Sequence, residues 1–277
     1  MKIQRNIYRD QGIHDFKNAL PLYNEVLRGW IIRCVKTPIL TVIKQPDQSM
    51  DFIPLDNAIM TAKGKNDKFL LLKIRVNTIF QNLILNATPK QFPQPLMTFL
   101  NSFMKEGGFV PYDFLTEFEQ DIFEFDSSDS LMNFGPKQKF LFIGSFIITQ
   151  FLIDRVLLRP EQNGFNTEIL PKPQENLKIL AAMIHGIYSE VMYDTFKSIL
   201  IERKVLLDDE ENRAEIIEDY IYHRYRYCKK LIHLELLDYA YSPDFTSGAQ
   251  TNKEWWDEMK EKCAKFIVLI YKLLENQ

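Results

Sequence analysis

The residues with the widest range of possible chemistry are gathered in the stretch "YIYHRYRYCKKLIH", residues 220–233. This stretch combines four tyrosines, two arginines, two lysines, two histidines and one cysteine. Basic side chains can neutralise phosphates while aromatic rings stack on bases. Taken as a list of residues, the stretch is therefore typical of a surface that binds nucleic acid.

A helical projection at 100° per residue separates these side chains onto two faces. Most of the aromatic and apolar residues, including Tyr225 and Leu231, fall on one face, and most of the basic residues, including Lys230, fall on the opposite face. A stacking surface needs both kinds together. The net charge of −3 provides no general attraction for polyanions either. We therefore favour a solvated face opposite a core face and find no strong nucleic-acid signal.

One pair in the stretch nevertheless resembles a known catalytic pair. Arg226 and His233 are similar to the Arg and His of HEPN-type helical ribonucleases, although Tyr227 stands where a polar residue usually follows the arginine. The resemblance covers a single helix. It implies an RNA-binding or RNA-cleaving protein in which Arg226 and His233 are the catalytic residues, and we keep this as an alternative.

An acidic stretch, "LLDDEEN" at residues 206–212, resembles the aspartate-rich segment of all-α isoprenoid synthases. The resemblance implies an isoprenoid or lipid-binding enzyme in which Asp208, Asp209 and Asn212 hold magnesium. No second segment of this kind is evident in the sequence. The acids also precede a predicted helix, where they stabilise the positive end of the helix dipole. We favour this capping role and keep the enzyme as a second alternative.

Metal and nucleophile motifs are otherwise missing from the sequence. It contains four histidines but no C-x-x-C or H-E-x-x-H, so we predict no metal and no cofactor. The three cysteines, Cys34, Cys228 and Cys263, are odd in number and widely spaced, which indicates free thiols in a reducing compartment. The first residues do not resemble a secretory signal. We expect an intracellular protein, cytoplasmic or mitochondrial.

Four residues are candidates for contacts with a partner. Arg224 and Glu235 project onto the apolar face of their helix, yet about 16 Å separates them along its axis. Each therefore needs a partner from elsewhere, because a buried unpaired charge is costly. Trp255 and Trp256 lie about 100° apart on a helix, which suits one ring in the core and the other near the surface. The alternative is that the preceding loop covers both rings. An exposed tryptophan is a common anchor of protein contacts.

The elements that position these residues are mostly helical. The longest apolar run, residues 140–153, would extend only about 21 Å as a helix, so we predict a buried core helix and no transmembrane segment. Residues 37–60 contain three prolines and the β-branched run "ILTVI", which predicts irregular chain with at most a short hairpin near 37–55. Further helices are predicted at 66–87 (capped by Asn66 or Asp67), 95–106, 111–125, 174–204, 209–241 and 252–275 (capped by Thr251 or Asn252).

These elements predict a predominantly all-α fold. An irregular multi-helix N-terminal part, residues 1–160, is followed by a linker at 161–173 that is rich in proline, and then by a three-helix bundle at 174–277. The two parts can also form one compact unit.

The sequence favours a protein without catalytic activity. No catalytic motif stands out, whereas the 21 phenylalanines require extensive burial or contact with a partner. We expect a soluble structural or interaction protein, an accessory subunit whose partners are other protein subunits. A mitochondrial respiratory-type assembly would suit such a subunit.

Overall fold

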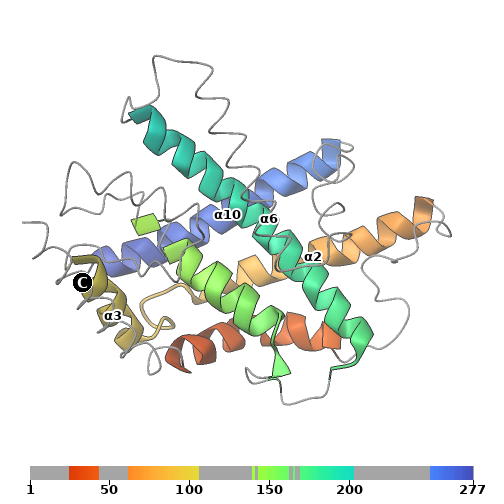
Figure 1. The fold of residues 1–277 in the computed structure, drawn as a ribbon, viewed down its shortest axis with the longest axis horizontal. Coiled ribbons are helices and arrows are strands. Elements are labelled where there is room, and N and C mark those ends of the chain that lie inside the picture. Colours follow the sequence, from red (N-terminus) through yellow and green to blue (C-terminus); the bar gives the residue numbers. More distant parts are fainter. Residues whose placement is uncertain are drawn as a thin grey trace, which may run out of the picture.

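All regular structure in the described part of the chain is helical, which confirms the predicted all-α fold. The computed structural model describes residues 25–43, 62–105, 139–140, 143–161, 165, 169–202 and 250–276. A helix at residues 25–43 precedes α2 (Ala62–Asn86), α3 (Gln94–Lys105), the π-helix η3 (Ser145–Leu157), α6 (Pro171–Glu202) and α10 (Gln250–Glu275) (Figure 1).

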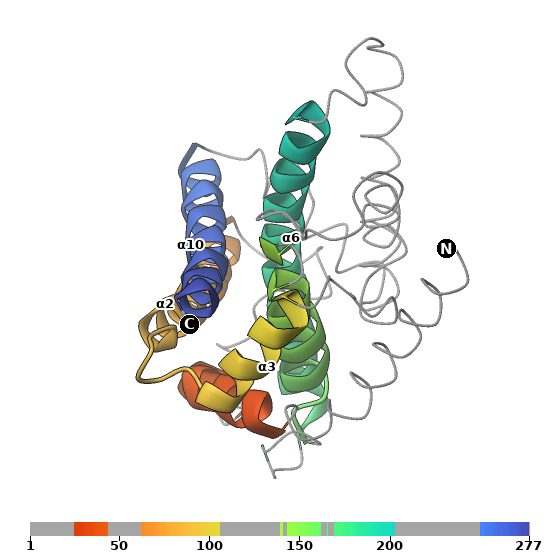
Figure 2. The same cartoon turned by 90° about the vertical axis from the view of Figure 1, so that its left-hand side faces the viewer.

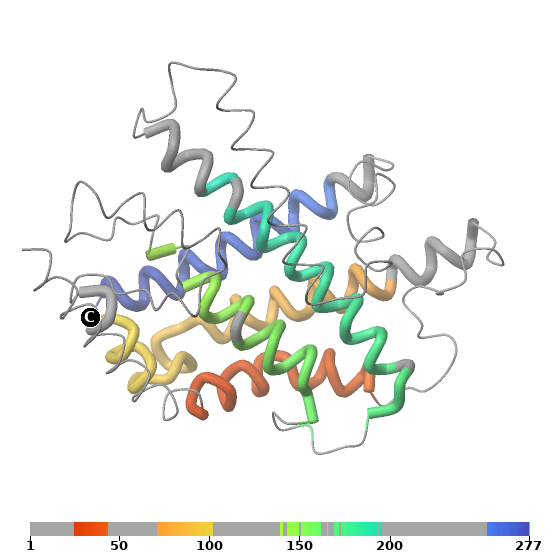
Figure 3. Tube along the Cα trace, viewed as in Figure 1, coloured from red at the N-terminus to blue at the C-terminus, as the bar shows by residue number. Residues whose placement is uncertain are grey.

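The longest helices form two layers. Helices α2 and α10 lie side by side in one layer, while α6 and η3 lie together in the other (Figure 2). Helix α10 crosses α6 and also contacts α3, so it touches helices of both layers (Figure 1). The trace shows that α2 and α10 run in the same direction (Figure 3). Helix α10 thus contacts α2, α3 and α6, and it lies at the centre of the described helices.

The sequence of α10 explains why it forms a helix and takes this place. Its buried side chains recur every three or four residues, so they line one face of a helix. They are Trp256, Met259, Cys263, Phe266, Ile267, Ile270 and Leu274. The exposed positions form an opposite stripe of Glu254, Glu258, Glu261, Lys265, Val268, Lys272 and Glu275. This stripe is charged at every position except Val268.

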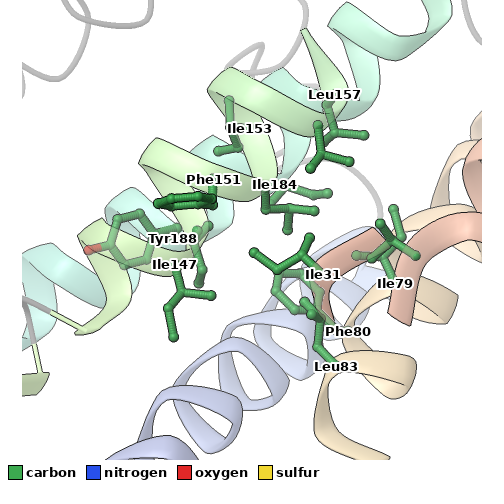
Figure 4. Packing of buried hydrophobic residues seen from close by; sticks show 14 of the residues in the cluster. Ile31, Ile79, Phe80, Leu83, Ile147, Phe151, Ile153, Leu157, Ile184 and Tyr188 are labelled. Carbon is green, nitrogen blue, oxygen red and sulfur yellow. The ribbon is translucent and has the colours of Figure 1, made fainter. Parts of the chain in front are cut away.

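The core joins segments that are far apart in the sequence. Trp30 stacks on Phe266 of α10 with ring centroids 6.3 Å apart, and it meets Phe92 edge-on at 4.9 Å. Nearby, Ile31 lies beside Phe80 and Leu83 of α2 (Figure 4). All six side chains are buried. The first helix, α2 and α10 therefore share one apolar cluster.

Helix η3 confirms the predicted buried helix but has a wider winding than an α-helix. Its hydrogen bonds join residues five apart, as between the Leu158 amide and the Ile153 carbonyl at 3.0 Å. Phe146 and Phe151 are also five residues apart, and their rings meet at 5.2 Å. Nearly all described side chains of η3 are buried. The continuous apolar sequence is thus explained by burial within the protein.

Gly144, directly before η3, is a point of close approach between three helices. A Cβ atom at this position would lie 2.6 Å from Cε2 of Tyr188 on α6 and 2.9 Å from Cδ1 of Ile267 on α10. Its backbone angles are ordinary for a right-handed helix, so the glycine is required by space and not by conformation. By contrast, a Cβ at Gly29 would meet nothing within 4 Å.

The prediction of irregular chain from residue 37 is wrong for residues 37–43, which continue the first helix. Ile39, Val42 and Ile43 are buried at helical spacing, and their burial outweighs both the β-branched run and Pro38. Thr41 adds a hydrogen bond from its hydroxyl to the Thr37 carbonyl, 2.9 Å away. The remainder of the predicted hairpin, residues 44–55, lies outside the described residues.

Several predicted helix starts also shift. Helix α2 begins at Ala62, so Asn66 and Asp67 lie inside it and do not cap it. Helix α10 begins at Gln250, which places Thr251 and Asn252 inside that helix. Helix α6 begins at Pro171, a residue type favoured in a first turn. The predicted helices at 111–125 and 209–241 lie outside the described residues, and the division into two parts stays a prediction.

Candidate functional site

Most of the residues predicted from sequence to carry chemistry lie outside the described residues. These are Asp208, Asp209, Asn212, Arg224, Arg226, His233 and Glu235. The ribonuclease-type pair, the magnesium site and the two charges on an apolar face therefore stay predictions.

The two tryptophans of α10 occupy different environments. Trp256 is in the core at 3% exposure, whereas Trp255 is partly buried. The Lys73 ammonium of α2 lies 5.5 Å from the centre of the Trp255 ring, a distance at which a cation is attracted to the ring face. Trp255 therefore helps to join α10 to α2.

Two lysines of α10 connect it to its neighbours. Lys262 donates a hydrogen bond to Oδ1 of Asn77 on α2 at 2.6 Å and also binds Glu258 on its own helix. Lys260 lies 3.5 Å from Glu190 of α6 and 2.9 Å from Asp257. These contacts join α10 to both layers. Neither lysine was identified from the sequence, because the side chain that each contacts belongs to a helix far away in the chain.

The environment of Lys260 favours its charged form. Burial acts to lower the pKa of Lys260, but the hydrogen bond from Lys260 to Asp257 and the negative charges of Glu190, Asp257 and Asp194 raise it overall. The lysine therefore stays protonated at neutral pH. It is suited to holding helices together and not to acting as a neutral amine nucleophile.

The two described cysteines are unreactive near neutral pH. Cys34 and Cys263 are free thiols in the core. Burial raises the pKa of Cys34 to about 12 and raises that of Cys263 as well. Because the thiolate is the reactive form, neither is a nucleophile near neutral pH. Cys228 lies outside the described residues.

A buried polar pair lies on α6. The Ser189 hydroxyl is 3.2 Å from Nδ1 of His185, one helical turn away, and each residue is 5% exposed. A serine beside an imidazole can serve as a nucleophile only where a substrate reaches it. Burial of both residues makes a structural role the better interpretation. Their four-residue spacing on a predicted helix was a signal available in the sequence, but it was not singled out.

The outer face of α2 carries a row of uncharged side chains. Leu71, Ile74, Thr78, Gln81 and Leu85 recur at alternating intervals of three and four residues, and together they form what we call the α2 strip. Ile74 is 45% exposed and Leu85 70% exposed. The Thr78 hydroxyl donates to the Ile74 carbonyl at 2.7 Å, so it is satisfied within the helix. The strip carries no charge, and its exposed apolar side chains are Ile74 and Leu85, whereas Leu71 is partly buried against the core.

Arg75 borders the α2 strip. Its side chain is half-buried, and burial lowers the pKa of its guanidinium group. Its Nε atom is buried and has no hydrogen-bond partner. In the described part of the chain, no carboxylate forms an ion pair with Arg75. A partly desolvated cation thus lies beside an apolar face.

The described residues form neither a metal site nor a membrane span. They contain no cluster of three or more His, Cys, Asp or Glu side chains that could hold a metal ion. Within the described ranges, no helix has both the length and the apolar character needed to cross a membrane. Comparison with family models, with curated proteins and with solved structures finds no match for this chain.

Proposed function

We propose that this chain is a non-enzymatic structural or interaction protein, an accessory subunit of a larger protein assembly. The α2 strip is the observation that carries the proposal. On the neighbouring helix α10, the outward stripe is almost entirely charged, as a solvated face should be. The α2 strip instead contains no charged residue, and two of its apolar side chains, Ile74 and Leu85, are exposed. Exposed apolar surface is a feature of interaction sites.

The polar side chains of the described helices support the same proposal. Lys73, Lys260 and Lys262 contact neighbouring helices, and the two described thiols are buried. These groups act in holding the fold together. Disulfides are rare in reducing compartments, so the two free thiols agree with the intracellular location that we propose, in the cytoplasm or in a mitochondrion. A respiratory-type assembly is the mitochondrial context that we favour.

Co-purification tests the proposal. The tagged chain should be expressed at its native level, isolated under mild conditions and passed through a sizing column. We expect it to elute well above its own mass of 32.8 kDa together with partners in fixed proportion. Elution as a monomer that carries no partner would refute the proposed function.

A further inference from the structure

We draw no further inference here: the strongest candidate, the uncharged outer face of α2 on which Ile74 and Leu85 are exposed, does not identify a partner, because nothing in the described part of the chain shows what covers it.

Discussion

Replacing Gly144 by alanine should destabilise the protein, although alanine is the better helix former. The added Cβ would lie 2.6 Å from Cε2 and 2.9 Å from Oη of Tyr188, and 2.9 Å from Cδ1 of Ile267. Carbon atoms in contact prefer separations of about 3.5–4.0 Å. Both side chains are buried, at 2% and 0% exposure, so neither can move outward into solvent. The substitution therefore overpacks the junction of η3, α6 and α10.

Gly29→Ala is the control that isolates this cost. In a helix, alanine is favoured over glycine by about 1 kcal/mol. At Gly29 nothing opposes that gain, because the new Cβ meets no atom within 4 Å. At Gly144 the gain is offset by overpacking, which costs about 1–3 kcal/mol. We expect Gly29→Ala to raise the free energy of unfolding and Gly144→Ala to leave it about 1–3 kcal/mol below that of the control variant.

Urea denaturation of the two variants measures this difference, and Ile267→Val provides a second-site test. That substitution removes the Cδ1 atom, which would lie 2.9 Å from the new methyl group. On its own it should cost about 0.5–1.5 kcal/mol. In the Gly144→Ala background it should cost less, because it also relieves a clash, and a double-mutant cycle reports the coupling. Equal stability of the two alanine variants, or no coupling to Ile267→Val, would refute the close approach of the three helices.

Two further predictions concern the core and the helix contacts. Burial raises the pKa of Cys34 from its ordinary value of 9.0 to about 12. The protonated thiol therefore contributes fully to stability below pH 9, and this contribution is lost as pH rises because the thiol of the unfolded chain ionises first. The loss in the free energy of unfolding reaches about 4 kcal/mol near pH 12. Cys34→Ala should flatten the alkaline decline in the free energy of unfolding; an unchanged decline would contradict this. Lys262→Met should cost about 1 kcal/mol through loss of its hydrogen bond to Asn77. Lys265→Met, at an exposed position of the same helix, should change stability by less than about 0.5 kcal/mol, and equal effects in thermal denaturation would argue against the α2–α10 contact.

The sequence predicted the long helices because their burial repeats along a single segment. Helix α10 was expected at 252–275 and spans Gln250–Glu275, with its apolar residues on one face. The first helix shows where such reasoning fails. Val35, Ile39 and Val42 repeat at helical intervals, but Pro38 and the β-branched residues around it favoured irregular structure. Packing of this face into the core decided the outcome, and local propensity does not include that energy.

The candidate surface was harder to predict, because exposure depends on neighbours that are remote in the sequence. The spacing from Leu71 to Leu85 is visible in the sequence, yet helix α2 looks apolar nearly all round. The packing of other helices on its other sides, α10 and α6 among them, shows which residues remain outside. The same holds for Lys262 and Asn77, which are 185 positions apart. Local pair rules apply within a few residues and cannot reveal such a contact.

The central place of α10 has a consequence for how the chain is made. A ribosome produces α2, α3 and α6 before it begins α10, yet all three contact that helix. Until Phe266 has been synthesised, Trp30 lacks its stacking partner. The apolar faces of the earlier helices that α10 covers therefore stay exposed until α10 has been synthesised. Exposed apolar surface favours aggregation and the binding of chaperones. We expect nascent chains that end before residue 250 to associate with chaperones and to be released once α10 has emerged.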